Sequence, residues 1–197
     1  GHAGVRLALG IAGIRYRVTG REYVPAGAAV YCSNHQSNVD PPVLFEALHH
    51  RLHILYKAEL HKFPIMGTVF DVGGFVPVER ENKERAMASI DRGARSLRSG
   101  NSFLIFPEGT RSRTDTLLPF KKGGFIMAIR AQVPVVPVAI LGARAAMEKG
   151  SAIVRPVTVT VRIGEPVPTA GLVDDDRDAL IERVRARVQA LVEQGPL

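Results

Sequence analysis

Hydrophobic and polar residues follow strand and helix periods in turn along the chain. Leu52 to Lys57, Val135 to Leu141 and Val157 to Ile163 have the apolar or alternating pattern of strands, the last with one exposed face. Apolar residues recur at helical spacing from Ala86 to Leu97 and from Leu180 to Leu191. We interpret the arginines of the last helix as a solvated face. Strands separated by helices predict an α/β fold.

Shorter patterns complete the expected order of elements. They predict strands at Ile14 to Val18, Ala29 to Cys32, Phe75 to Val78 and Ser102 to Phe106, helices at Pro41 to Leu48 and Gly123 to Arg130, and an irregular helical stretch from Leu60 to Phe70. No repeat or linker interrupts this order. We therefore expect a single domain over residues 1–197, with a mixed, largely parallel sheet flanked by helices.

A histidine and an aspartate stand five residues apart in the stretch from Ser33 to Pro42. Asp40 precedes Pro41, which is typical of a helix N-cap followed by proline in the first turn. We therefore expect His35 on a loop between a strand and a helix, within reach of the Asp40 carboxylate. Such a pair can take a proton from a hydroxyl, because the carboxylate orients and stabilises the imidazole. The alternative is a loop hydrogen bond without catalysis.

No G-x-S-x-G elbow accompanies this pair, so we expect the activated hydroxyl to belong to a substrate. Cys32 precedes the histidine by three residues, where a small buried side chain is expected rather than a thiol nucleophile. Possible zinc ligands stand at helix-like spacing, namely Glu46, His49, His50 and His53. That segment is short and lacks a fourth ligand, so we expect no metal.

The block from Phe106 to Arg113 combines the groups that bind an anion. Gly109 lets the backbone approach a ligand, and Thr110 adds a hydroxyl donor. Arg111 offers a forked donor that matches phosphate geometry. Glu108 is the exception, because a carboxylate repels phosphate; it could order an arginine or accept a hydrogen bond from a substrate hydroxyl. A surface loop with ion pairs is the alternative.

Two further segments carry positive charge near expected strand or helix ends. Arg80 follows a short apolar strand, and Lys121 and Lys122 come just before a helix. Pairing of Arg80 with Glu84 along the following helix would be a structural alternative. The proline-flanked run from Val133 to Val138 could line an apolar groove or form a core strand.

Composition supports an anionic partner. The chain has 197 residues, a formal net charge of +7, 46% hydrophobic residues, 6% aromatic residues and no Trp. Net positive charge favours anionic membrane, phosphorylated substrates or an acidic carrier protein. We expect no nucleic acid, because basic and aromatic residues do not interleave. One cysteine excludes an internal disulfide.

The N-terminus suggests contact with a membrane. No apolar run is long enough to span a bilayer. We interpret residues 1–13 as the remnant of an N-terminal membrane-associated helix, because Val5 to Ile14 is largely apolar. Gly1 and His2 are interpreted as a tag scar.

These blocks together resemble the four motifs of the glycerophosphate acyltransferase family, and above all the 1-acyl-glycerol-3-phosphate acyltransferases. Asn34-His35 with Asp40 resembles the H-x4-D motif, and Gly74-Phe75 with Arg80 resembles the second motif. Phe106 to Arg111 resembles the third motif and Val133 to Pro137 the fourth. Their order and spacing also match, and the resemblance covers Tyr16 to Gly164. It implies a glycerol-3-phosphate acyltransferase-like fold.

The resemblance also implies a reaction. His35, oriented by Asp40, would deprotonate the hydroxyl of 1-acyl-glycerol 3-phosphate, which then attacks an acyl thioester directly and yields phosphatidate. Residues expected to hold the acceptor's phosphate end are Arg80, Glu108, Gly109, Thr110, Arg111 and Lys121. The donor would be acyl-CoA or acyl-carrier protein, with no other cofactor and no metal. We expect the enzyme at the cytoplasmic face of the cell membrane, as a peripheral protein or anchored through a removed N-terminal segment.

Three alternatives stay open at this point. The acceptor could be another lysolipid or glycerol 3-phosphate. A thioesterase could use the same pair on water, although water needs no phosphate clamp. A lipid-binding domain without catalysis would use His35 only structurally.

Overall fold

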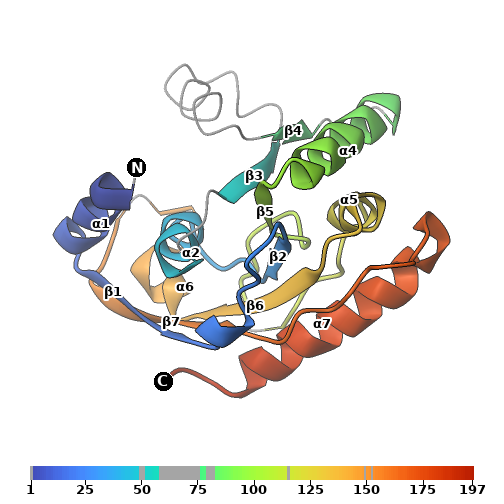
Figure 1. Cartoon of the computed structure of the whole chain (residues 1–197). Helices are drawn as coiled ribbons and strands as arrows, with labels where there is room; N and C mark the ends of the chain where they lie inside the picture. Colours follow the sequence, from blue (N-terminus) through green and yellow to red (C-terminus); the bar gives the residue numbers. More distant parts are fainter. Residues whose placement is uncertain are drawn as a thin grey trace.

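Helices cover both faces of a central sheet (Figure 1). The computed structural model describes residues 2–48, 52–57, 76–78, 83–114, 116–148, 150–151 and 153–197. The strands are β1 (Ile14–Thr19), β2 (Val30–Ser33), β3 (Leu52–Lys57), β4 (Val76–Val78), β5 (Ser102–Ile105), β6 (Val135–Leu141) and β7 (Val157–Ile163). The α-helices are α1 (His2–Ile11), α2 (Asp40–Leu48), α4 (Lys83–Arg98), α5 (Gly123–Ala131), α6 (Ala143–Ala146) and α7 (Arg177–Glu193). Two short 3-10 helices are η1 (Arg21–Tyr23) and η3 (Asp174–Asp176).

Within the described ranges, the sheet has 7 strands in the order β1-β7-β6-β2-β5-β3-β4. Neighbouring strands are parallel except for β6 and β7, which are antiparallel. This confirms the predicted fold class, a mixed and largely parallel sheet flanked by helices. Because β2 pairs in parallel with both β5 and β6, the carboxyl ends of these three strands meet at one edge. Ligands of open α/β sheets bind at such an edge.

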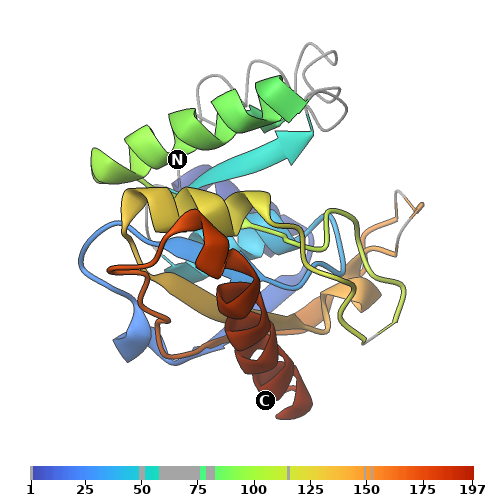
Figure 2. The same ribbon diagram turned by 90° about the vertical axis from the view of Figure 1, so that its right-hand side faces the viewer.

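The core lies in two layers, one on each face of the sheet. Successive strand residues point to opposite faces, and β2 shows both: Tyr31 packs with α2 and α6, whereas Val30 and Cys32 pack with α4, α5 and α7. All three side chains are fully buried. Figures 1 and 2 show the corresponding arrangement of helices around the sheet. Burial on both faces explains why the central strands are almost entirely apolar.

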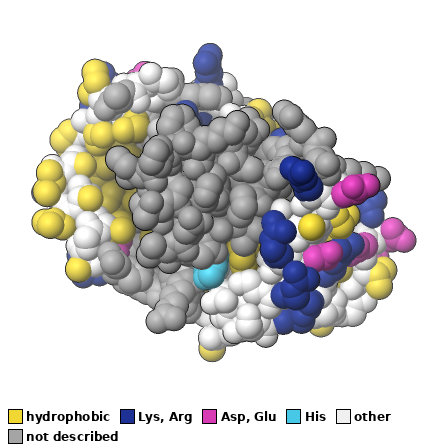
Figure 3. Space-filling model, turned by 90° about the horizontal axis from the view of Figure 1, so that it is seen from above, with side chains coloured by type: hydrophobic (Ala, Val, Ile, Leu, Met, Phe, Trp, Pro, Cys, Tyr) yellow, Lys and Arg dark blue, Asp and Glu magenta, His cyan; other side chains and the backbone are white. Residues whose placement is uncertain are grey.

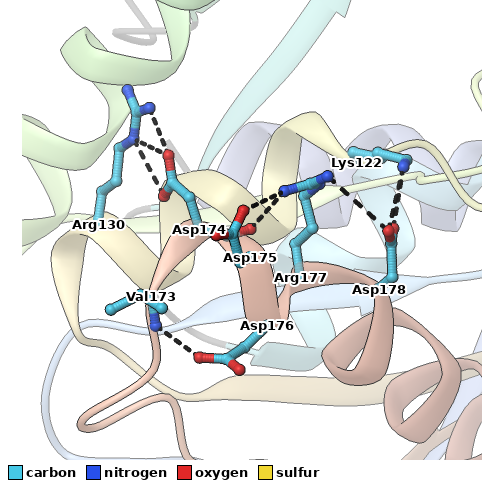
Figure 4. Close-up of polar contacts among 8 residues, drawn as sticks. All are labelled: Lys122, Arg130, Val173, Asp174, Asp175, Asp176, Arg177 and Asp178. Carbon is cyan, nitrogen blue, oxygen red and sulfur yellow. Dashed lines mark hydrogen bonds and ion pairs between the residues drawn. The ribbon is translucent and has the colours of Figure 1, made fainter.

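Ion pairs join α4, α5 and α7 on one face. Arg130, in the last turn of α5, lies 2.6 Å from Asp91 of α4. It also lies 2.5 Å from Asp174 of η3 (Figure 4). These carboxylates raise the pKa of the Arg130 guanidinium by hydrogen bonding to its charged form. Lys122 makes a more exposed pair with Asp178 at 3.0 Å. Arg130 therefore holds three segments together with one side chain.

Two expectations about exposed faces hold only in part. Thr160, on the face of β7 expected to be exposed, is buried, and its hydroxyl accepts a hydrogen bond from the N–H of Leu197. In α7, the expected stripe is largely buried, but its arginines are not simply solvated. The guanidinium of Arg187 donates to the carbonyl and carboxylate of Glu165. In both places a segment distant in sequence contacts part of the polar face, whereas Thr158 and Arg183 on these faces are exposed.

Some predicted elements lie outside the described residues. These are the helical stretch from Leu60 to Phe70 and the first residue of the strand predicted from Phe75 to Val78. None of the helices in the described part of the chain is both long and apolar enough to cross a membrane.

Candidate active site

The loops that follow β2, β5 and β6 come together at the carboxyl edge of the sheet. The loop after β2 contains His35, and the loop after β5 contains Glu108. The N–H of Ser112 donates to the carbonyl of His35 at 2.8 Å, so these two loops are in direct contact. This confirms the expectation that parallel strands bring the two motifs to the same edge.

Asn34 joins the first loop to β6. Its side-chain amide donates to the carbonyl of Ile140 at 2.9 Å, and its side-chain oxygen accepts from the N–H of Ile140 at 2.8 Å. The side chain thus makes the two hydrogen bonds that another strand residue would make. Because Asn34 is only 3% exposed, these bonds are shielded from water. They fix the main chain immediately before His35.

His35 and Asp40 form the predicted pair. Nδ1 of His35 lies 2.7 Å from Oδ2 of Asp40, and the side chains are 18% and 0% exposed. An ionised carboxylate only accepts hydrogen bonds, so the ring carries its proton on Nδ1 and leaves a lone pair on Nε2. Nε2 is therefore the atom that can accept a proton from a substrate hydroxyl.

The predicted N-cap role of Asp40 is wrong. Asp40 is the first residue of α2, and its Oδ2 also accepts the N–H groups of Gln36 at 2.6 Å and Ser37 at 2.8 Å. These donors precede the helix, so the carboxylate is turned back towards the histidine loop. The same contacts hold the carboxylate in the position that orients the imidazole.

The loop after β5 supports His35 from a second side. The imidazole stacks on Phe106, with ring centroids 4.1 Å apart and planes inclined by 22°. Oε1 of Glu108 accepts the N–H of His35 at 2.9 Å, and its Oε2 accepts the N–H of Leu118 at 3.0 Å. Sequence reasoning missed these contacts, because their donors are main-chain groups.

Burial dominates the electrostatics of Glu108. It raises the pKa of this carboxyl, and the charge of Asp40 adds to the rise, whereas the two main-chain N–H groups and His35 oppose it. Burial also raises the pKa of the Cys32 thiol, and the charge of Glu108 adds to that rise. Cys32 is fully buried in the core, which confirms the expectation of a small buried side chain rather than a nucleophile.

Gly109 and Lys121 lie against each other beside Glu108. Gly109 has a φ of 70°, and a Cβ there would lie 2.9 Å from Cε of Lys121. The positive φ favours glycine, and any other residue would also displace the end of the Lys121 side chain. Thr110 is exposed and Arg111 is half-buried in the same loop. These four residues are together, as the sequence predicts, next to the histidine loop.

Arg80 lies outside the described residues. The strand before it, β4, is parallel to β3, and β3 is parallel to β5, so its carboxyl end points to the same edge as the other motifs.

The zinc-like spacing does not form a cluster in the described part of the chain. Glu46 is buried and accepts a hydrogen bond from Arg6 at 3.1 Å, and His53 lies against Phe103. No group of three metal-ligating side chains occurs among the described residues, which exclude His49 and His50.

Comparison with known proteins gives the same assignment as the motifs. The model of the family described as Acyltransferase matches residues 15–141. A 1-acyl-sn-glycerol-3-phosphate acyltransferase of Cocos nucifera is 32% identical over 187 residues, covering 94% of this chain and 60% of that protein. The 1-acyl-sn-glycerol-3-phosphate acyltransferase beta of Homo sapiens is 37% identical over 172 residues, covering 86% of this chain and 62% of that protein. The chain thus spans about three fifths of the length of these curated relatives.

A solved structure has the same fold. The crystal structure of the 1-acyl-sn-glycerophosphate (LPA) acyltransferase PlsC from Thermotoga maritima superposes with a TM-score of 0.84 and 28% sequence identity. The match covers 98% of this chain and 77% of that one. The matched family region contains His35, Asp40 and the loop after β5. The chain belongs to the Acyltransferase family.

Proposed function

We propose that this protein transfers a fatty acyl group from an acyl thioester to the free hydroxyl of 1-acyl-glycerol 3-phosphate, which forms phosphatidate for phospholipid synthesis. The observation that carries the proposal is the 2.7 Å contact between His35 and Asp40 beside a loop rich in anion-binding groups. The names of the two curated relatives and of the solved structure support the same acceptor.

The proposed reaction needs one base and no covalent intermediate. Nε2 of His35 takes the proton of the acceptor hydroxyl while its oxygen attacks the thioester carbonyl. The carbon–sulfur bond breaks as the ester bond forms, and the proton passes from the imidazolium to the departing thiolate. Asp40 stabilises the imidazolium during this step. The bond changes and proton transfers of this reaction require no metal and no cofactor besides the acyl donor, which is acyl-CoA or acyl-carrier protein.

The acceptor's phosphate would bind at the loop after β5. Arg111, Lys121 and the hydroxyl of Thr110 supply charge and hydrogen-bond donors there, and Arg80 would extend this site. Lys121 crosses Gly109, whereas the neighbouring Lys122 pairs with Asp178. This difference gives a matched test: Lys121→Met should raise the KM for the acceptor about tenfold, and Lys122→Met should leave it unchanged. Equal effects of both substitutions would contradict the assignment.

Acyl transfer itself is tested with a long-chain acyl-CoA and lysophosphatidate, measuring free thiol and phosphatidate in parallel. We expect equal amounts of both products, and loss of both in His35→Ala. Acyl-carrier protein loaded with the same chain replaces the CoA ester in a second assay, which identifies the donor. Thiol release that does not depend on lysophosphatidate would indicate a thioesterase instead. Tight lysophosphatidate binding without turnover would indicate a lipid-binding domain.

Peripheral binding to the cytoplasmic face of the membrane is part of the proposal. In α1, Leu7 and Ile11 are 65% and 80% exposed. Figure 3 shows hydrophobic side chains on the side of the molecule where α1 lies and a group of Lys and Arg side chains on the opposite side. Leu7→Asp combined with Ile11→Asp should reduce co-flotation with phosphatidylglycerol-containing vesicles several-fold. Val173→Asp, at an exposed apolar residue of another segment, is the control, and equal losses would contradict a role of α1.

A further inference from the structure

Glu108 uses both of its carboxylate oxygens on main-chain donors. Oε1 accepts the N–H of His35 at 2.9 Å and Oε2 accepts the N–H of Leu118 at 3.0 Å. The residue is only 4% exposed, so water does not replace these bonds. Leu118 lies ten residues further along the chain, so Glu108 connects the histidine loop to both ends of the loop that follows β5.

The histidine peptide is held on both sides by that second loop. Its N–H donates to Glu108, and its carbonyl accepts the N–H of Ser112 at 2.8 Å. The imidazole is held separately, by Asp40 at 2.7 Å and by stacking on Phe106. The ring and the main chain of His35 therefore have different supports. Asp40 and Phe106 orient the ring, whereas Glu108 and Ser112 fix the main chain from which the ring extends.

We infer that Glu108 is a positioning residue, which sets the place of the catalytic base through the main chain of His35 instead of binding the acceptor's phosphate. The inference refines the proposed acyl transfer and rests on it. A carboxylate repels phosphate, and the two oxygens of Glu108 are directed to N–H groups. A displacement of a catalytic group by about 1 Å can cost on the order of 100-fold in rate. The contact to the His35 peptide is therefore expected to act on kcat.

Two substitutions separate position from charge. Glu108→Gln keeps the length of the side chain, but its amide has one acceptor and places an N–H₂ group opposite one of the main-chain donors. Glu108→Asp keeps the charge, but its side chain is shorter by one methylene and cannot span both donors. If the two-point contact matters, both variants lose activity. If only the negative charge matters, Glu108→Asp remains active.

The first measurement is kcat and the KM for lysophosphatidate in both variants, with Glu182→Gln on the exposed face of α7 as the control. We expect kcat to fall about 10- to 100-fold in both, with the KM for lysophosphatidate within about threefold of the wild-type value. The control should match the wild type. A tenfold or larger rise in that KM at unchanged kcat would overturn the inference and make Glu108 a ligand of the acceptor.

The second measurement tests the contact between Glu108 and the His35 peptide independently of enzyme activity. Amide hydrogen exchange followed by mass spectrometry should show faster exchange in a peptide covering residues 33–40 of Glu108→Gln, while peptides from α7 exchange as in the wild type. Unchanged exchange in the histidine loop would overturn the inference. If the wild type has no turnover, the proposed function fails, and the exchange rates alone decide whether Glu108 holds the His35 peptide. If Glu108→Gln does not fold, Glu108→Asp takes its place in both measurements.

Discussion

Oδ2 of Asp40 lies 2.7 Å from Nδ1 of His35 and accepts the N–H groups of Gln36 and Ser37 as well. One buried oxygen therefore orients the imidazole and closes the loop that carries it. The ring orientation and the loop conformation are therefore coupled, because a change in either one breaks hydrogen bonds to the same oxygen. A buried acceptor with several donors resists such a change.

Asp40→Asn should lower kcat by about 10³- to 10⁴-fold and change the acceptor KM little. The amide keeps the size of the side chain but removes the negative charge that stabilises the imidazolium. Steady-state kinetics with lysophosphatidate measures the effect. Asp178→Asn, at an exposed aspartate of α7, should behave as the wild type. A wild-type kcat in Asp40→Asn would contradict the role of the pair.

The raised pKa of Glu108 predicts a pH dependence of stability. An unfolded glutamate has a pKa of about 4.3, and burial raises the pKa of Glu108 in the folded chain. Between these two pKa values, Glu108 is protonated in the folded chain and ionised in the unfolded chain. The contribution of Glu108 to the free energy of unfolding is thus largest below about pH 4.3 and decreases as the pH rises through the folded-state pKa.

Urea unfolding of the wild type and Glu108→Gln between pH 4 and 7 measures this contribution. The difference in the free energy of unfolding, wild type minus variant, should decrease as the pH rises, by at most about 1.4 kcal/mol per pH unit. Titrating groups that do not interact with Glu108 cancel in the difference. Parallel curves for the two proteins, or a difference that increases with pH, would contradict the predicted shift.

Asn34→Ala should destabilise the fold by about 2–3 kcal/mol. The substitution removes both hydrogen bonds to Ile140 and leaves a buried N–H and a buried carbonyl of β6 without these partners. Urea unfolding at pH 7 measures the change. In Asn101→Ala, which removes a half-buried side-chain bond to Ser96, the loss should be about 1 kcal/mol or less. Equal losses would show that the Asn34 contacts contribute no special stability.

Arg130→Met should destabilise the fold by about 1 kcal/mol at low salt, and by less in 1 M NaCl. Arg130 is 30% exposed, and its partners Asp91 and Asp174 are 44% and 40% exposed, so water screens part of the attraction. Thermal unfolding at two salt concentrations measures the effect. The control is Arg155→Met, because Arg155 and Glu148 form a pair that is 63% and 66% exposed, and it should change stability little. A loss that does not depend on salt would point to packing of the alkyl chain instead.

The strands were predictable wherever burial alone determines them. The bounds of β3, β6 and β7 agree with the hydrophobic pattern. The end of β5 differs from the prediction by one residue, and β2 lies one residue further along the chain at both ends. The hydrophobic pattern does not predict α6 (Ala143–Ala146), because a helix of 4 residues is too short to show a helical period. The hydrogen bond that the Thr160 hydroxyl accepts also could not be predicted, since its donor, the N–H of Leu197, lies far along the chain.

The site was predictable to the extent that its residues act through side chains. The contact between His35 and Asp40 follows from a short spacing, and Gly109 and Lys121 come together from two segments of the loop between β5 and α5. Glu108 is different, because its partners are the main-chain N–H groups of His35 and Leu118. Any residue type can supply an N–H group, so no residue pattern marks these partners.

The pairing of the first strand with the last affects how the chain is made. β1 pairs with β7, with Ile14 opposite Val157, so the ribosome releases the first strand long before its partner exists. At about 5–20 residues per second, β1 waits on the order of ten seconds, a period in which an unpaired strand can join another chain. Arg15 and Arg17 are exposed at alternate positions of β1. Charged residues on a waiting strand oppose such pairing, so these arginines would protect the nascent protein from aggregation until its own last strand arrives.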